Sequence, residues 1–373
     1  MKSLELSSLL SLYKACRLCP RDCMVDRLSG HRGFCGEGSD LHIAAIEAHF
    51  GEEPPLTGWN GSGTVFFTGC SLRCSYCQNY QISRMGMGRS LSVPGVVARI
   101  SRLQRFEGIH NINLVTPDHF IPHTIALVSE LRSTGVHLPV IFNVSGYQRV
   151  DSLRLVEPFV DIYLPDFKYG DAKLAAVLSR AEDYPALALE AIQEMLRQKG
   201  FLDRWEPGQS CFSGSPKGLA AKGVLVRHLV LPGQLKNSLD ALTMLFLEFG
   251  PDLPLSLMSQ YAPVGNLLPE GLDRTVFPVE FQRVLEHALE LGFRRVFYQP
   301  LTEHSTANSE RPFLPDFTRK RPFLGNLRIH VRAKQGPGFW GTLKNSALGR
   351  KNSSRESIPG TLLEHGSGPE DKS

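Results

Sequence analysis

Three cysteines with tight spacing are the residues in this sequence best suited to chemistry. Cys70, Cys74 and Cys77 form a C-x3-C-x2-C pattern within the stretch GSGTVFFTGCSLRCSYCQNY. Cysteine thiolates are the usual protein ligands of iron–sulfur clusters. Three thiolates can hold three irons of a cubane and leave the fourth iron open, whereas a closed structural zinc site needs a fourth protein ligand, such as a distant histidine. The pattern therefore predicts a catalytic [4Fe–4S] centre.

The position of this loop agrees with a catalytic role. The apolar run TVFFT at 64–68 is typical of a buried strand, and the cysteines follow it after Gly69. In parallel α/β architectures, the loops after the carboxyl ends of the strands build the active site. We therefore expect this loop to face the reaction cavity.

A second cysteine group lies nearer the N-terminus. Cys16, Cys19, Cys23 and Cys35 have the spacing C-x2-C-x3-C-x11-C. Four thiols at this spacing suit a closed zinc site, or a second Fe–S cluster that relays electrons, and the spacing does not choose between them or exclude an unmetallated group. Cys211 stands alone in the Gly/Pro/Ser-rich stretch 203–223, which predicts a loop with a free thiol.

Strand-like and helix-like segments alternate along most of the chain. The strand-like runs are LHIAAIEAHF (41–50) and then 64–68, 112–116, 139–143, 160–166, 224–231, 254–260 and 294–299. Helical periodicity is found near 93–106, 122–134, 172–198, 238–249 and 278–291. Such alternation predicts an α/β protein with a parallel sheet and right-handed crossovers. Periodicity alone permits a partial barrel or an open doubly wound sheet.

Composition divides the chain into three sections. We expect a Cys-rich N-terminal section at 1–58, a barrel at 59–317 and a basic, disordered tail at 318–373. From Arg319 onward the chain has eleven Lys/Arg and four Asp/Glu, whereas the remainder has 30 and 33. The basic character thus lies in the tail, for which we expect a solvated extension rather than a nucleic-acid contact.

The sequence gives no sign of a membrane or secreted protein. No apolar run reaches the roughly 18 to 20 residues that span a bilayer. The N-terminal stretch MKSLELSSLLSLYKAC carries Glu5 and lacks a small-residue cleavage site. We expect a cytoplasmic protein without a membrane partner, in which clustered cysteines serve metal ligation rather than disulfides.

The motifs together resemble a known family. CxLCPRxC…GFC is followed in order by the cysteine loop, HNINLVTPDHF, FNVSGY, VDIYLPDFKYGD, RHLVLPG, LMSQYAPVG and FLPDF. This series, over roughly residues 14–317, resembles the radical S-adenosylmethionine (SAM) superfamily, and within it an uncharacterised subfamily related to pyruvate formate-lyase activating enzyme. The resemblance implies a partial (β/α)6 barrel of the TIM-like type.

The resemblance also implies cofactors and partners. SAM would chelate the open iron, and one electron from a flavodoxin- or ferredoxin-type donor would cleave its C–S bond to give a 5′-deoxyadenosyl radical. The radical would abstract hydrogen from a substrate, which could be a glycyl-radical enzyme, another protein or a small molecule.

Further cofactor-binding residues follow from the resemblance and from strand ends. Asp166 and Lys168 match an Asp-x-Lys whose lysine assists SAM binding, and Tyr76 is the aromatic residue before the last cysteine of the signature. Arg227 matches an arginine near SAM, while the adjacent His228 should point to the opposite face of the strand. Tyr261 takes the place of a histidine near the ribose.

Two other strand ends complete the expected site. Asn143 and Ser145 could contact SAM or substrate, or could serve only turn formation before Gly146. Thr116 follows the second strand, where the activating enzymes have a glycine-rich motif for the SAM amino group, and Thr116 or a backbone carbonyl could accept from that group. His119 could be a cap or core residue.

One alternative comes from a different class of protein. A non-catalytic zinc-binding module could contact nucleic acid through its first cysteine group and basic tail. It would bind zinc, would not bind SAM and would be colourless. Two cysteine groups on a barrel-like chain favour the enzyme.

Overall fold

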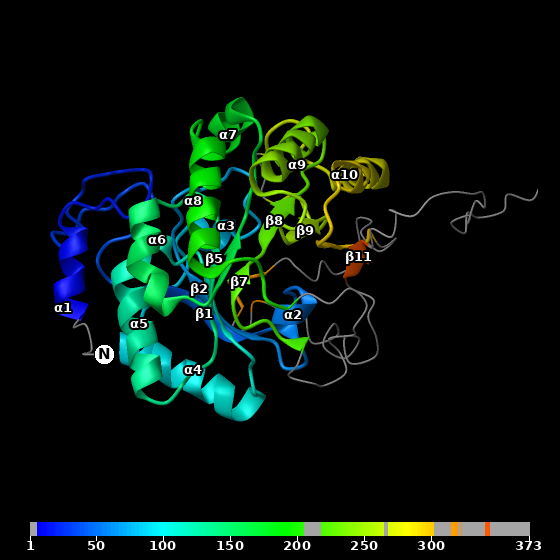
Figure 1. The fold of residues 1–373 in the computed structure, drawn as a ribbon. Helices are drawn as coiled ribbons and strands as arrows, with labels where there is room; N and C mark the ends of the chain where they lie inside the picture. Colours follow the sequence, from blue (N-terminus) through cyan, green and yellow to red (C-terminus); the bar gives the residue numbers. More distant parts are fainter. Residues whose placement is uncertain are drawn as a thin grey trace, which may run out of the picture.

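Parallel strands in chain order form the centre of the molecule. The computed structural model describes residues 6–204, 218–264, 268–301, 315–319, 322 and 340–343. The parallel strands are β2 (Ser62–Phe67), β4 (Ile112–Val115), β5 (Val140–Val144), β6 (Ile162–Pro165), β7 (Gly223–Val224), β8 (Val226–Leu229), β9 (Leu255–Met258) and β10 (Val296–Tyr298). An isolated parallel bridge between Asp166 and Arg227 joins the β2–β7 sheet to the β8–β10 sheet. The strands thus form the partial barrel that was expected (Figure 1).

Helices follow the strands and cover the outside of the barrel. In chain order the helices are α1 (Leu6–Leu9), α2 (Pro54–Thr57), α3 (Tyr80–Ser83), α4 (Val93–Glu107), α5 (Ile121–Ser133), α6 (Val150–Val156), α7 (Ala172–Ser179), α8 (Tyr184–Lys199), α9 (Leu235–Phe249) and α10 (Pro278–Leu291). Short 3₁₀ turns occur at Leu10–Tyr13, Asp118–Phe120 and Glu157–Phe159. From α4 to α10, neighbouring cover helices contact one another in the order α4, α5, α6, α8, α9, α10. Among the residues that the structure describes, no helix is long and apolar enough to cross a membrane.

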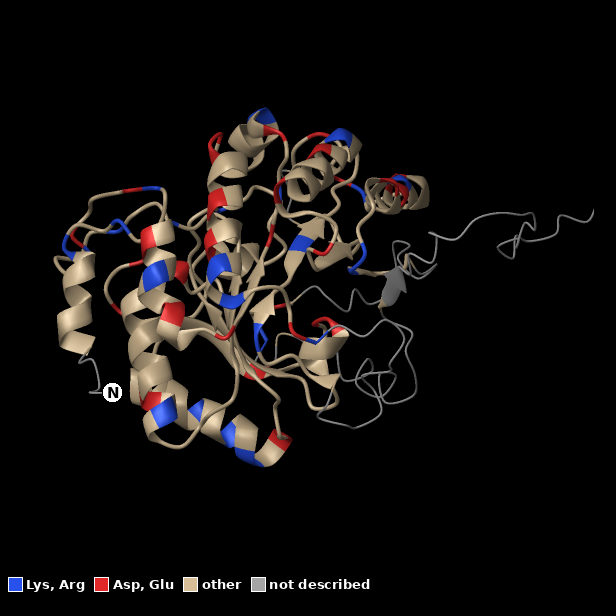
Figure 2. Cartoon of the chain, viewed as in Figure 1, with Lys and Arg blue, Asp and Glu red and all other residues tan. Residues whose placement is uncertain are grey.

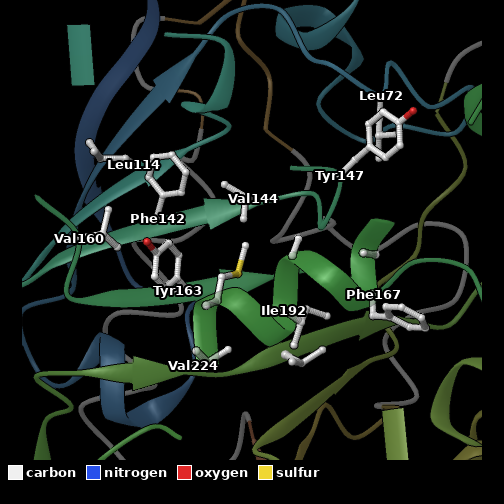
Figure 3. Packing of buried hydrophobic residues seen from close by; sticks show 14 of the residues in the cluster. Leu72, Leu114, Phe142, Val144, Tyr147, Val160, Tyr163, Phe167, Ile192 and Val224 are labelled. Atoms are coloured by element: carbon white, nitrogen blue, oxygen red, sulfur yellow. The ribbon is translucent and has the colours of Figure 1, made fainter. Parts of the chain in front are cut away.

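Two apolar clusters arise because residues along a strand alternate between faces. The larger cluster lies between the strands and the helices. Figure 3 shows part of it, with Phe142 and Tyr163 on neighbouring strands, their ring planes at 88° and their centroids 6.1 Å apart. The smaller cluster draws on alternate strand residues, among them Ile141, Ile162 and Leu225. It fills the lumen, so the barrel is a packed core with its cavity at one end.

The helix expected over 172–198 was wrong as a single element. The chain forms α7 and α8 instead, because Arg180 takes a left-handed conformation at φ 51° and ends α7. Pro185 then lies in the first turn of α8, where proline is tolerated, whereas inside a continuous helix it would remove a hydrogen bond. Helix α6, between β5 and β6, was not predicted, because it is only 7 residues long.

Both ends of the barrel sheet carry antiparallel strands. At one end β1 (His42–His49) pairs with β2 and with β3 (Arg89–Ser90), so the chain before residue 58 already contributes to the main sheet. At the other end β11 (Gly341–Leu343) pairs with β10. A short edge strand thus lies within the section that was expected to be a disordered tail. Cys211 lies outside the described residues.

Candidate functional site

The three-cysteine loop follows β2 and is held against the N-terminal section. The Gly69 N–H donates to the Ile82 carbonyl at 2.9 Å, and the Cys70 N–H donates to the Cys35 carbonyl at 3.4 Å. Gly69 has φ +73°, and a Cβ there would lie 2.5 Å from Cγ of Glu37 and 2.8 Å from the Cys35 oxygen. Only glycine fits, because the loop backbone runs directly along the segment of the first cysteine group.

The three thiols of the loop surround one cavity. Cys70, Cys74 and Cys77 all line a cavity of about 250 Å³ at the carboxyl ends of the strands. Burial raises the pKa of the Cys70 thiol, and the neighbouring Cys74 and Asp118 raise it further. Burial followed by Cys74 likewise raises the pKa of Cys77. A polynuclear ligand bound in this cavity would hold the three thiols as thiolates.

The donor set fits a cluster better than a single ion. In the described residues, no group of three or more His, Cys, Asp or Glu side chains is arranged to hold a metal ion. A cubane binds each thiolate at a different iron, so its ligands do not have to converge on one point. Three buried or half-buried thiols around a cavity meet that requirement.

Most of the predicted cofactor residues come together around this cavity. They arrive from separate strand ends and from the cysteine loop itself. The cavity is lined by Tyr76, Thr116, Asn143, Ser145, Asp166, Lys168 and Arg227. The topology of parallel strands explains this convergence, because their carboxyl ends share one rim.

Lys168 is held as a cation at the rim. Its Nζ lies 2.5 Å from Oδ2 of Asp166. Burial by itself would lower the lysine pKa, but the Asp166 carboxylate outweighs it and raises that pKa above its ordinary value. The backbone N–H of Lys168 donates to the Tyr184 hydroxyl at 2.8 Å, and that hydroxyl lies 2.8 Å from the carbonyl oxygens of both Ser145 and Asp166. The ammonium therefore has a fixed place in the cavity wall.

Arg227 reaches the cavity in a way that the sequence did not indicate. Its Nε donates to Oε1 of Glu53 at 2.9 Å, and its Nη2 contacts both Glu52 and Glu53. Oε1 of Glu52 also accepts a hydrogen bond from Asn113 at 2.7 Å. Burial opposes ionisation of Glu52, but Arg227 outweighs it and lowers the pKa of that carboxyl. The positive charge of Arg227 in the cavity wall is thus already paired with Glu52 and Glu53.

Sequence reasoning missed the two glutamates because their partner is 174 or 175 residues away. The sequence analysis assigned no role to either residue. The signal that could have revealed them is two adjacent acids between a strand and the short helix α2, in a chain with an inward-facing arginine. As strand alternation requires, His228 points away from the cavity, with Nδ1 2.6 Å from the Phe167 carbonyl and Nε2 2.9 Å from the Ser238 hydroxyl.

Tyr261 is placed differently from the expectation. It does not line the cavity, and its hydroxyl donates to the Leu272 carbonyl at 2.7 Å. Its ring packs edge-on against Tyr76, with centroids 6.2 Å apart. Gln260, the preceding residue, lines the cavity instead. Tyr261 therefore supports the ring of Tyr76 from behind. The predicted contact of Tyr261 with a ribose stays a prediction, and the hydrogen bond to Leu272 does not favour it because it engages the same hydroxyl.

Thr116 has an unusual backbone conformation at the end of β4. Its φ is +58°, which is a genuine outlier for a β-branched residue. The Thr116 N–H donates to the Asn143 carbonyl at 2.8 Å, which ties two strand ends together. Strained residues of this kind concentrate at functional sites. His119, three residues on, is buried in the core, with Nε2 2.7 Å from the Thr68 carbonyl.

The first cysteine group lies beside the cysteine loop. Cys16, Cys19 and Cys35 are buried, and Cys23 is half-buried, with its sulfur accepting the Phe34 N–H at 3.3 Å. Burial raises the pKa of the Cys35 thiol to about 11, and Cys16 contributes to the shift. Cys35 borders the loop of Cys70 through the backbone contact described above.

Comparison with known families matches part of the chain. The model described as the Radical SAM superfamily matches residues 64–203, from β2 through the end of α8. The matched region includes the three-cysteine loop.

Two particular proteins are similar to the chain. The uncharacterized protein MJ0674 of Methanocaldococcus jannaschii is 27% identical over 263 residues, which is 68% of each chain. A crystal structure of methylornithine synthase (PylB) is 13% identical, with a TM-score of 0.41, over 71% of this chain and 78% of that one.

Proposed function

We propose that this chain is an oxidoreductase that cleaves SAM reductively at a [4Fe–4S] cluster held by Cys70, Cys74 and Cys77. The observation that carries the proposal is the convergence of these thiols on one cavity within the region that the Radical SAM superfamily model matches. When bound, the cluster and SAM would supply a 5′-deoxyadenosyl radical that abstracts hydrogen from substrate.

The residues of the cavity wall have distinct roles in this proposal. Lys168, fixed as an ammonium by Asp166, attracts the carboxylate of SAM. Asn143 and Ser145 offer polar groups from the neighbouring strand end. Thr116, in its strained conformation, directs the backbone at the end of β4 toward the SAM amino group. Tyr76 adds an apolar wall that excludes water.

The motif resemblance bears on the substrate. We therefore propose a protein substrate, with activation of a glycyl-radical enzyme as the form that the motif resemblance supports.

We also propose a second metal centre at Cys16, Cys19, Cys23 and Cys35. Burial of Cys16, Cys19 and Cys35 supports it, and the contact of Cys35 with the loop of Cys70 favours an Fe–S cluster, which can relay electrons, over zinc, which cannot. Its position beside Cys70 suits electron relay.

The test is anaerobic reconstitution with iron and sulfide, followed by metal analysis and an assay for 5′-deoxyadenosine with dithionite as reductant. We expect Cys74→Ala to lose one cluster's worth of iron and all product, and Cys19→Ala to lose the other share of iron. Ser75→Ala, in the same loop, is the matched control. Undiminished product in Cys74→Ala, or zinc bound at these three thiols, would contradict the proposal.

Product analysis then separates the substrates. Incubation with a glycyl-radical enzyme should give a protein-based radical signal in electron paramagnetic resonance. If 5′-deoxyadenosine forms but the glycyl-radical enzyme acquires no radical, the substrate is another protein or a small molecule.

A further inference from the structure

A second cavity lies on the other side of the cysteine loop. It measures about 420 Å³ and is lined by Phe34, Arg73, Arg84, Val177, Ser179 and Arg180, among others. It shares no lining residue with the cavity that the three cysteine thiols surround. Three segments build it: the first cysteine group's segment, the loop after β2 and the end of α7. We call this surface the basic face.

The basic face carries positive charge without acidic partners. Arg73, Arg84 and Arg180 line the cavity, and no Asp or Glu does. The Arg73 guanidinium donates only to backbone carbonyls, those of Phe34 at 3.3 Å and Arg84 at 3.1 Å. Among the described residues, no carboxylate lies within 4 Å of the three guanidinium groups.

A fourth arginine strengthens this charge. Arg21 donates to the carbonyls of Ser71 at 2.8 Å and Ser179 at 2.6 Å, and its guanidinium lies 3.9 Å from the ring centroid of Phe34. Arg21 thereby fastens the end of α7 to the cysteine loop. Both Lys/Arg and Asp/Glu residues occur along several helices of the chain (Figure 2).

Exposed apolar side chains accompany the arginines. Val177 in the cavity wall is 72% exposed, and Met85, next to Arg84, is 64% exposed. A small apolar contact with surrounding charge suits a transient protein partner, because electron-transfer encounters bury little area and rely on electrostatic steering. A small anion alone would not require these apolar residues.

The basic face also reaches a cluster ligand. Ser179 lines the cavity, and its hydroxyl donates to the sulfur of Cys74 at 3.0 Å. The Ser179 side chain alone therefore lies between this second cavity and the sulfur of Cys74. A partner that docks here approaches the cluster while leaving the SAM cavity free for substrate.

We propose that the basic face is the docking site of an acidic one-electron carrier protein. This inference rests on the proposed function, since it needs a cluster at Cys74. The carrier loses one electron and the cluster gains that electron. No covalent bond forms or breaks and no proton is transferred at this step. Negative charge around the carrier's redox group complements the arginines.

The test uses charge reversal on the reconstituted protein. The probes are flavodoxin and a [2Fe–2S] ferredoxin, and the variant is Arg84→Glu with Arg180→Glu. The control is Arg102→Glu with Arg105→Glu, two exposed arginines on α4, which lies at the bottom of Figure 1, whereas α7 lies at the top. The readouts are the Kd for each oxidised carrier at low ionic strength and the rate of cluster reduction by each reduced carrier.

We expect the Kd for at least one carrier to rise about tenfold or more in the variant and to stay within about twofold in the control, as loss of a few charge contacts implies. Added salt should weaken wild-type binding far more than variant binding. Reduction by dithionite, which needs no docking, should be equal in all three proteins and shows that the cluster is intact.

Two results would overturn the inference: wild-type protein that binds neither carrier, or a variant that binds both as wild type does. Failure of the proposed function looks different. In that case dithionite yields no 5′-deoxyadenosine from wild-type protein, while the Kd values still report whether the carrier docks at the basic face.

Discussion

The Ser179 hydroxyl donates a hydrogen bond to the Cys74 sulfur at 3.0 Å, although the two residues are 105 positions apart. Ser179 is the last residue of α7. The Tyr169 hydroxyl lies 2.5 Å from the Ser179 oxygen and can donate to it, which orients the serine proton toward sulfur. The helix after β6 therefore contacts Cys74, a proposed cluster ligand on the loop after β2, and hydrogen bonds to cluster ligands tune the reduction potential.

Ser179→Ala should lower the reduction potential of the cluster, because the hydrogen bond stabilises the more negative, reduced state. One net hydrogen bond of about 1 kcal/mol corresponds to about 40 mV for a one-electron couple. Redox titration monitored by electron paramagnetic resonance measures the shift. Ser75→Ala is the control, since no hydrogen bond joins its hydroxyl to the rest of the described chain. Equal potentials in the two variants would show that the Ser179 contact has no influence.

Substitutions on the two sides of the Arg227 ion pairs should lower the free energy of unfolding by different amounts. Arg227→Met leaves Glu52 and Glu53 buried without their cation, and removing one partner of a buried pair costs about 3–5 kcal/mol. Glu53→Gln keeps the Arg227–Glu52 pair and removes the surplus negative charge, so we expect a loss of only about 1 kcal/mol. Urea unfolding of the cluster-free protein measures both. Similar losses would mean that the two glutamates do not share the arginine.

Acid should destabilise the protein below neutral pH through its buried histidines. Burial lowers the pKa of His228 to about 4, and burial likewise lowers that of His123 to about 4. Because an unfolded histidine takes up its proton near pH 6.5, the unfolded chain binds more protons between pH 6.5 and 4. Stability is therefore fully present above pH 6.5 and is lost as the pH falls toward 4.

Each histidine should contribute up to about 1.4 kcal/mol per pH unit in this window. Urea unfolding of cluster-free protein at several pH values measures the slope. His228→Gln should reduce it by up to about 1.4 kcal/mol per pH unit, while His123 and the other histidines whose pKa burial lowers, His49 and His110, keep their own contributions. A slope unchanged by this substitution would mean that His228 takes up its proton equally in both states.

Gly69→Ala should disrupt the cysteine loop. The new Cβ would lie 2.5 Å from Glu37 and 2.8 Å from the Cys35 carbonyl, in a backbone with φ +73°. We expect a loss of about 2–3 kcal/mol from the clash and the left-handed conformation, with lower iron content. Gly86→Ala is the control, since its φ is +65° but nothing lies within 4 Å of its Cβ. It should lose about 1 kcal/mol and keep its iron. Equal iron content in the two variants would show that the close packing at Gly69 is not needed for cluster binding.

Much of the site was predictable because it depends on local spacing. The spacing of Cys70, Cys74 and Cys77 is set by the chain itself. Strand alternation put Arg227 and His228 on opposite faces, and the family resemblance chose Arg227 as the one that faces the lumen. Parallel strands bring their carboxyl ends to one rim, which is why Asn143 and Lys168, from different strands, were expected together and line one cavity. The break between α7 and α8 could also have been read from Pro185.

The tertiary structure alone decided which residues distant in the chain contact one another. The pairing of Arg227 with Glu52 and Glu53, the hydrogen bond from Ser179 to Cys74 and the strand formed at 341–343 each join segments far apart in sequence. The sequence determined which groups carry chemistry and on which face of a strand they lie, since both follow from local backbone geometry. Packing of whole elements determined which charges are neutralised and which, as on the basic face, remain exposed.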